Sequence, residues 1–189
     1  MQKSVLSLLV LFCGLFFSCK KDNIDPQGNF TVYTIKQGSQ SSNSGVRLFS
    51  GKSLRFTARF DSTAVYSTTN PRNQHDINKL YGFSDCSSKH HENSARFGWR
   101  WTNNELQIFA YTYKGGVRSS QHVTNVRLNA DYNFQIEISG KEYVFTVNGA
   151  TVRMGRQCSG NGGLKYYLYP YFGGDESAPH DISIRINEQ

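Results

Sequence analysis

The sequence predicts an all-β fold of two packed antiparallel sheets, a β-sandwich or jelly roll. Apolar and polar residues alternate with a period of two in many short segments, most clearly in residues 53–60 and 131–138. Turn residues separate these segments, and Asn148-Gly149 is the strongest short signal for a β-hairpin. Helical periodicity is almost absent between the segments. A dozen or so short strands without helices are typical of two packed antiparallel sheets.

Residues 131–155 predict three consecutive antiparallel strands. Apolar residues alternate through 132–138, 143–147 and 150–154, with a turn near Gly140 and another at Asn148-Gly149. This stretch resembles the paired strands of concanavalin A-like (laminin G-like) domains, in which an aromatic-rich strand precedes a hairpin that closes on Asn-Gly or Asp-Gly. The resemblance implies a concanavalin A-like jelly roll. It implies no particular function, because lectins, glycoside hydrolases, polysaccharide lyases and adhesion modules share this fold.

The first 18 residues have the pattern of a secretion signal. Lys3 precedes an apolar run from Val5 to Phe17, which is shorter than the roughly 20 residues of a membrane-spanning helix. The run ends in Leu15-Phe16-Phe17-Ser18-Cys19, which resembles the lipobox of bacterial lipoproteins. Phe16 stands where that motif usually has Leu, a looser usage typical of Bacteroidetes-type bacteria. The resemblance implies a lipid on Cys19, and the alternative is a plain signal peptide with a chance cysteine.

These patterns divide the chain into three expected regions. Residues 1–18 form the signal peptide, residues 19–29 form the lipidated Cys19 and a polar tether, and residues 30–189 form the β-sandwich domain. The lipid would anchor the protein in the outer membrane. The charged stretch Lys20-Lys21-Asp22 partly resembles signals for surface export, so we expect display at the cell surface, with the periplasmic face as the alternative.

Composition indicates the kind of partner that the mature chain would meet. Removal of residues 1–18 from the 189-residue chain leaves 171 residues, enough for one domain with a substantial core. Only Lys3 is lost from the charged residues, so 20 Lys and Arg face 14 Asp and Glu, a net charge of +6. Outside the cytoplasm such a protein meets acidic polysaccharide, lipid headgroups or lipopolysaccharide, and we expect no nucleic acid partner. Ordinary solubility explains the same charge.

Two of the four cysteines remain available in the mature domain. Cys13 leaves with the signal and Cys19 carries the lipid, which leaves Cys86 and Cys158. An even pair in an oxidising compartment predicts a disulfide, and its loop of about 70 residues would stabilise the fold by roughly 4 kcal/mol. Two buried free thiols are the alternative. Cysteine and histidine spacings typical of a structural zinc site do not occur in the sequence.

Residues 94–113 contain the candidate binding face. A two-residue turn at Asn103-Asn104 sets the register of the strands on either side. One face then has the apolar pairs Trp101 with Leu106, Trp99 with Ile108, and Phe97 with Ala110, and is expected in the core. The opposite face pairs Arg100 with Gln107, Gly98 with Phe109, Arg96 with Tyr111, and Ser94 with Tyr113.

This second face combines guanidinium groups, aromatic rings and an amide, which suits a sugar ligand. Sugar rings stack their C–H faces on aromatic rings, and the planar guanidinium group donates paired hydrogen bonds to hydroxyls or carboxylates. In the alternative, Arg stems and Tyr rings merely cover the sheet, and the loop histidines are solvated. We predict as ligand-binding residues Arg96, Arg100, Gln107, Phe109, Tyr111 and Tyr113, with His90 and His91 from the preceding polar loop.

Two further segments are less informative. The tyrosine-rich stretch 166–172 sends about half of its rings inward, and the sequence leaves open which half is exposed. Gly173-Gly174-Asp175-Glu176, together with Asp181, could supply oxygen ligands for calcium, although an ordinary exposed turn explains the same acids. We expect no other cofactor or metal.

The acidic residues argue against glycoside hydrolysis. A glycosidase needs two carboxylates that flank the scissile bond, and the Glu-x-Asp-x-x-Glu motif of concanavalin A-like glucanases is absent from the sequence. The residue types of the candidate face resemble those of jelly-roll alginate lyases, but Phe109 stands where that family has His. We therefore predict a non-catalytic, surface-anchored lipoprotein that captures a polysaccharide. The alternatives are a polysaccharide lyase acting on a uronate glycan, and an adhesion or structural lipoprotein that binds a protein partner.

Overall fold

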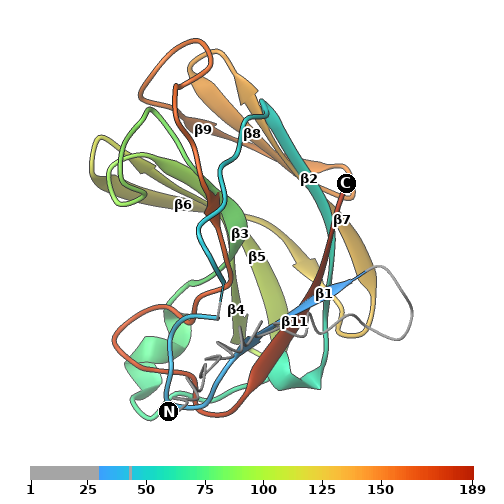
Figure 1. The fold of residues 1–189 in the computed structure, drawn as a ribbon. Helices are drawn as coiled ribbons and strands as arrows, with labels where there is room; N and C mark the ends of the chain where they lie inside the picture. The colour runs from blue at the N-terminus through green and yellow to red at the C-terminus, as the bar shows by residue number, and fades with distance from the viewer. Residues whose placement is uncertain (1–29, 43) are drawn as a thin grey trace, which may run out of the picture.

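The computed structural model describes residues 30–42 and 44–189, which form two antiparallel sheets packed face to face (Figure 1). The six-stranded sheet has the order β1-β11-β2-β7-β8-β9, and the five-stranded sheet has the order β10-β3-β4-β5-β6. The predicted all-β antiparallel sandwich is therefore confirmed. The strands are β1 (Thr31–Ile35), β2 (Ser53–Phe60), β3 (Asn78–Ser84), β4 (Ser94–Thr102), β5 (Glu105–Lys114), β6 (Val117–Val126), β7 (Asp131–Ser139), β8 (Glu142–Val147), β9 (Ala150–Gly155), β10 (Tyr167–Leu168) and β11 (Ile182–Glu188).

Two short 3-10 helices, η1 (Ser62–Ala64) and η2 (Pro71–His75), lie between β2 and β3. No helix in the described ranges is long and apolar enough to cross a membrane. The predicted signal peptide, the lipidated Cys19 and the tether lie outside the described residues.

Strands β7, β8 and β9 form the three-strand meander that the alternation predicts. Phe134 pairs with Val147 between β7 and β8, and Phe145 pairs with Val152 between β8 and β9. The second turn places Asn148-Gly149 at positive φ values of 44° and 95°, the backbone conformation that a two-residue hairpin turn requires.

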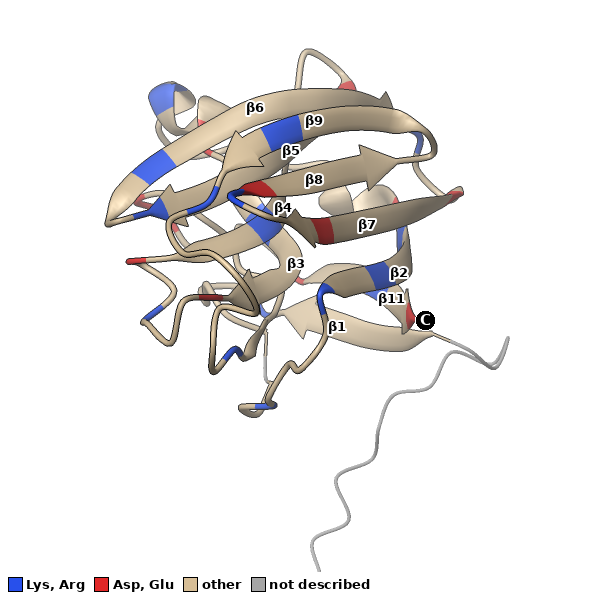
Figure 2. Ribbon diagram, turned by 90° about the horizontal axis from the view of Figure 1, so that it is seen from above, with Lys and Arg blue, Asp and Glu red and all other residues tan. Residues whose placement is uncertain are grey.

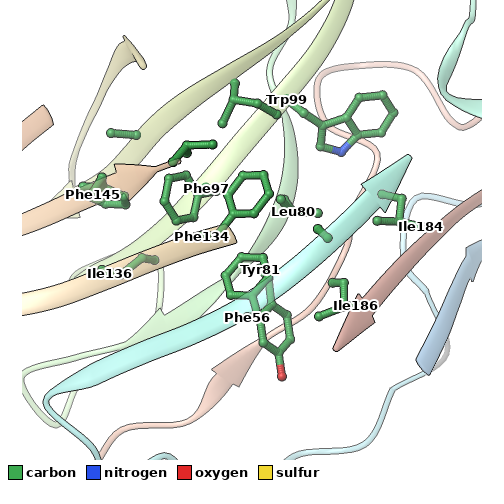
Figure 3. Close-up of a cluster of buried hydrophobic side chains, with 14 of the residues drawn as sticks. Phe56, Leu80, Tyr81, Phe97, Trp99, Phe134, Ile136, Phe145, Ile184 and Ile186 are labelled. Carbon is green, nitrogen blue, oxygen red and sulfur yellow. The ribbon is translucent and has the colours of Figure 1, made fainter. Parts of the chain in front are cut away.

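Aromatic rings from both sheets fill the core (Figure 3). The ring of Phe134 stacks on Phe56 and meets the edge of Phe97, with ring centroids 5.0 Å apart in both pairs. Trp99 is fully buried and lies 5.4 Å from the ring of Phe60. Phe97 and Trp99 therefore point into the core from β4, as the predicted register requires.

A disulfide between Cys86 and Cys158 joins the loop after β3 to the loop after β9. Beside it, the fully buried carboxylate of Asp85 pairs with the guanidinium group of Arg156 and accepts a hydrogen bond from the Tyr143 hydroxyl (2.8 Å). Asp85 and the two cysteines form a cluster of potential metal ligands in the described part of the chain, but both sulfurs are bonded to each other. This buried ion pair has partners for both charges, as buried charges normally do.

Candidate functional site

The outer face of the five-stranded sheet, the face turned away from the core, carries the predicted binding residues. Asn103 and Asn104 adopt positive φ values of 52° and 57° and join β4 to β5. The register agrees with the prediction at every pair: Arg100 with Gln107, Gly98 with Phe109, Arg96 with Tyr111, and Ser94 with Tyr113.

A pocket of about 350 Å³ opens on this outer face. We call it the β3–β6 pocket, because each of these four strands contributes a side chain to its wall. It brings together five of the eight predicted ligand-binding residues with five others. The predicted residues are His90, His91, Arg96, Tyr111 and Tyr113, and the others are Lys79, Arg118, Tyr171, Gly174 and Asp175.

A bulge in β3 makes room for the pocket. The pairing of β3 with β4 shifts between Lys79 and Gly82, and the intervening Leu80 and Tyr81 are both fully buried. Such a bulge re-aims the residues beside it, so the side chain of Lys79 reaches the outer face. A Cβ atom on Gly82 would lie 2.3 Å from the Cβ of Arg96. Any larger residue at position 82 would therefore displace Arg96 from the pocket wall.

Arg96 is a buried cation that forms no ion pair with any residue the structure describes. Arg96 is only 6% exposed, and its Nε atom has no hydrogen-bond partner among the described residues. Its Cζ atom lies 5.4 Å from the centre of the Tyr111 ring. Burial lowers the pKa of the guanidinium group, and nearby tyrosines act in the opposite direction. An arginine keeps its proton in proteins. The fold therefore places an uncompensated positive charge in the pocket wall, which is costly unless an anion binds there.

Lys79 adds a second cation to the same wall. Its Nζ atom lies 5.2 Å from the centre of the Tyr111 ring and 5.9 Å from that of Tyr171. Burial, followed by the positive charges of Arg96 and Arg118, lowers the pKa of this amine to about 8. At neutral pH most of the lysine is protonated, and an anion in the pocket would favour the protonated form.

Arg118 from β6 completes a group of three cations around the pocket. In the view of Figure 2, β6 carries basic and no acidic residues. Within the described residues, no carboxylate lies within 4 Å of the charged groups of Lys79, Arg96 or Arg118. Asp175 lines the pocket but is exposed to solvent. The pocket is therefore electropositive.

The two histidines lie at one end of the pocket with their rings 4.1 Å apart. The backbone N–H of His90 donates to the Tyr166 hydroxyl (3.0 Å), and the same hydroxyl shares a hydrogen bond with Nδ1 of His90 (3.1 Å). Burial, followed by the charges of Arg96 and His91, lowers the pKa of His90 to about 4. His90 is thus neutral at physiological pH.

Three predicted ligand-binding residues lie outside the β3–β6 pocket. The Nε atom of Arg100 donates to Oε1 of Gln107 (2.8 Å), and Nη1 donates to the carbonyl oxygen of His75 (2.9 Å). Its Cζ atom lies 4.7 Å from the centre of the Phe109 ring. Arg100, Gln107 and Phe109 contact one another, and Arg100 fastens η2 to the sheet.

Ile77 separates the two arginines on the outer face. A Cβ atom on Gly98 would lie only 2.4 Å from Cγ2 of Ile77, so the isoleucine lies directly over the glycine that stands between Arg96 and Arg100. The expectation that both arginines belong to one site is corrected here, because the segment after η2 covers the strip between them.

Sequence reasoning missed Lys79, Arg118 and Tyr171. The sequence contains a signal for Arg118. A two-residue turn at Gly115-Gly116 pairs this residue with Tyr113, which is the register that the structure shows. Lys79 depends on the β3 bulge, and Tyr171 depends on which side of the tyrosine-rich segment meets β3. Alternation alone predicts neither.

Two of the three acids proposed as calcium ligands, Glu176 and Asp181, have other partners. The Glu176 carboxylate accepts backbone N–H bonds from Thr69 (2.7 Å) and Asn70 (2.8 Å). The Asp181 carboxylate accepts bonds from Lys36 Nζ (2.6 Å) and the Gln37 backbone (2.9 Å). Calcium binding by these residues stays a prediction.

Solved structures with similar folds include alginate lyases and a glucanase. The catalytic domain of an endo-1,3-beta-glucanase (laminarinase) from Thermotoga petrophila is 9% identical, with a TM-score of 0.54 over 84% of this chain and 75% of that chain. An alginate lyase from Corynebacterium is 11% identical, with a TM-score of 0.53 over 88% and 78%. The alginate lyase A1-II′ of polysaccharide lyase family 7 is 12% identical, with a TM-score of 0.51 over 87% and 82%.

At these identities the similarity shows the fold alone, a jelly-roll β-sandwich of the concanavalin A-like kind. No protein-family profile matches the chain, and no curated protein is significantly similar to it in sequence.

Proposed function

We propose that this protein binds an acidic polysaccharide in the β3–β6 pocket without cleaving it. The observation that carries the proposal is Arg96, a buried guanidinium group with an unbonded Nε and, among the described residues, no carboxylate within 4 Å. Together with Lys79 and Arg118 it surrounds a pocket of about 350 Å³. A carboxylate of a uronate residue would supply the missing counter-charge and accept the hydrogen bonds.

The tyrosine rings of the pocket support a sugar rather than a small inorganic anion. Tyr111, Tyr113 and Tyr171 line the same wall as the cations. Their rings offer faces for stacking, and their hydroxyls can bond to sugar hydroxyls. The fold similarity to solved alginate lyases and a laminarinase agrees with a polysaccharide ligand.

The proposed location rests on the sequence. The signal-like residues 1–18 and the lipobox-like segment before Cys19 support a lipoprotein anchored in the outer membrane. Display at the cell surface would let the domain capture polysaccharide from the surroundings.

A lyase that acts on the same glycan is the second candidate, and Lys79 favours it. With a pKa of about 8, this amine is partly neutral at mildly alkaline pH. A neutral amine in the pocket could take the proton next to a uronate carboxylate while Arg96 neutralises the carboxylate charge.

The test is titration of the purified chain with oligosaccharides of uronates and of neutral sugars, by calorimetry. Absorbance of new unsaturated uronate ends is recorded in parallel. Binding of acidic oligosaccharides without new absorbance supports the proposal. New absorbance would make the protein a lyase instead. If acidic oligosaccharides do not bind, the proposal is wrong, and a protein partner becomes the next candidate.

A further inference from the structure

A second groove of about 300 Å³ adjoins the β3–β6 pocket. Its walls are residues 41–42 and 44–46 on one side and residues 166–171 on the other, and we call it the side groove. Both cavities share His90, Arg96 and Tyr171 in their linings. A linear ligand seated in the pocket can therefore continue into the side groove.

The chemistry of the side groove differs from that of the pocket. Arg96 is the only charged group among the described residues that line it, whereas Lys79 and Arg118 also line the pocket. His90 is neutral there. The remaining lining consists of serines, tyrosines, one glycine, one proline and two aliphatic residues. One of these aliphatic residues is Val46, which is 89% exposed.

Hydrogen bonds between its two walls hold the side groove open in a defined shape. Ser42 donates from its backbone N–H (3.2 Å) and its hydroxyl (3.0 Å) to the carbonyl oxygen of Pro170. The Tyr171 hydroxyl donates to Oε1 of Gln40 (2.6 Å). A preformed wall of rings and hydroxyls costs little ordering on binding.

We propose that the side groove is a second subsite that takes an uncharged sugar residue, so that the preferred ligand has uronates next to neutral sugars. This inference rests on the proposed function. An uncharged sugar ring matches the side groove, because its C–H face can lie on apolar walls while its hydroxyls reach serine and tyrosine oxygens. A carboxylate there would lose water and gain no cation besides Arg96, whose charge the uronate in the pocket already uses.

Titration calorimetry with oligosaccharides of equal length tests the inference at physiological salt. One set alternates a uronate with a neutral N-acetylhexosamine, and the other sets are homopolymers of different uronates. We expect the best alternating oligosaccharide to bind at least tenfold more tightly than the best homopolymer. Equal affinities would overturn the second subsite and leave the pocket proposal intact. Absence of binding to every acidic oligosaccharide would instead overturn the proposed function.

The variant Val46→Asp tests the position of the subsite, because it adds a negative charge to the wall of the side groove. Val46 is 89% exposed, so the variant should still fold. Val46→Ser is a milder second variant that adds no charge. We expect at least a fivefold loss of affinity for the alternating oligosaccharide. Thr151→Asp, which adds the same charge to an exposed position on β9, is the control and should change affinity less than twofold. Equal effects of the two aspartates, or none from Val46→Asp, would overturn the assignment.

Discussion

Arg96 and Arg100 lie four residues apart on the same outer face of β4, yet they have opposite surroundings. Arg100 bonds to Gln107 and to the carbonyl oxygen of His75, and it lies over the ring of Phe109. Arg96 is more deeply buried and has an unbonded Nε. The guanidinium group of Arg100 is bonded within the fold, whereas Nε of Arg96 has no partner among the described residues. Both residues are arginines on the same face of the same strand. Their different surroundings therefore come from η2 and the segment after it, which contact Arg100 and the strip between the arginines.

The buried ion pair of Asp85 and Arg156 strengthens this comparison. That arginine is as deeply buried as Arg96, but it pairs with a carboxylate and with three backbone carbonyl groups. The buried charge of Arg156 is therefore paired within the fold. An unpaired one at a pocket is the feature to test.

The largest expected effect comes from Arg96→Gln. Removal of this cation should weaken acidic glycan binding by about 100-fold, because a charge-assisted hydrogen bond in a desolvated site is lost. Stability should stay the same or rise, since an unpaired buried charge is removed. Titration calorimetry and urea unfolding measure the two quantities. A large loss of stability with unchanged affinity would reverse the roles assigned to the two arginines.

Arg100→Gln should show the opposite pattern. Loss of its bond to the His75 carbonyl group loosens η2, and the free energy of unfolding should fall by about 1–2 kcal/mol. Glycan affinity should change less than about threefold, because the side chain lies outside the β3–β6 pocket. A strong loss of affinity at unchanged stability would show that η2 moves aside and that both arginines bind the ligand.

The third prediction concerns pH and Lys79. The pKa of this amine is about 8 in the free protein, and a bound carboxylate raises it. Affinity should therefore be constant at lower pH and fall as pH rises through 8, by up to about tenfold per unit. The arginines of the pocket keep their protons, as arginine does in proteins, and His90, whose pKa is about 4, stays neutral over this range. Calorimetry from pH 6.5 to 9.5 on the chain and on Lys79→Met checks this, and an unchanged pH dependence in the variant would contradict it.

The smallest effect is expected from Arg153→Gln, a change far from the outer face. This arginine pairs with Glu142 across β8 and β9 at 3.1 Å, with both side chains at least half exposed. Stability should change by less than about 0.5 kcal/mol. Any loss of glycan affinity should stay below about twofold and disappear as salt is added. A larger loss would mean that net charge, rather than the pocket, drives binding.

Local patterns predicted the strands and one side of the site. The Asn103-Asn104 turn and the alternation around it determine that Arg96, Tyr111 and Tyr113 leave the core, because a one-residue slip would bury the polar set. The same reasoning extended through Gly115-Gly116 would have added Arg118. The bulge that exposes Lys79 could not be predicted, since Leu80 and Tyr81 break the period of two.

The sequence by itself determined the all-β class, the register of β4 with β5, and the set of side chains on the outer face. Those properties follow from interactions between residues that are close along the chain or directly paired across a hairpin. Only the tertiary structure decided that Arg100 bonds to the last residue of η2 and that Ile77 lies between the two arginines, while Arg96 lines an open pocket with Lys79 and Tyr171. From Arg96 or Arg100 on β4, these partners lie 17 to 75 residues away along the chain, and local patterns carry no information about where such distant segments meet.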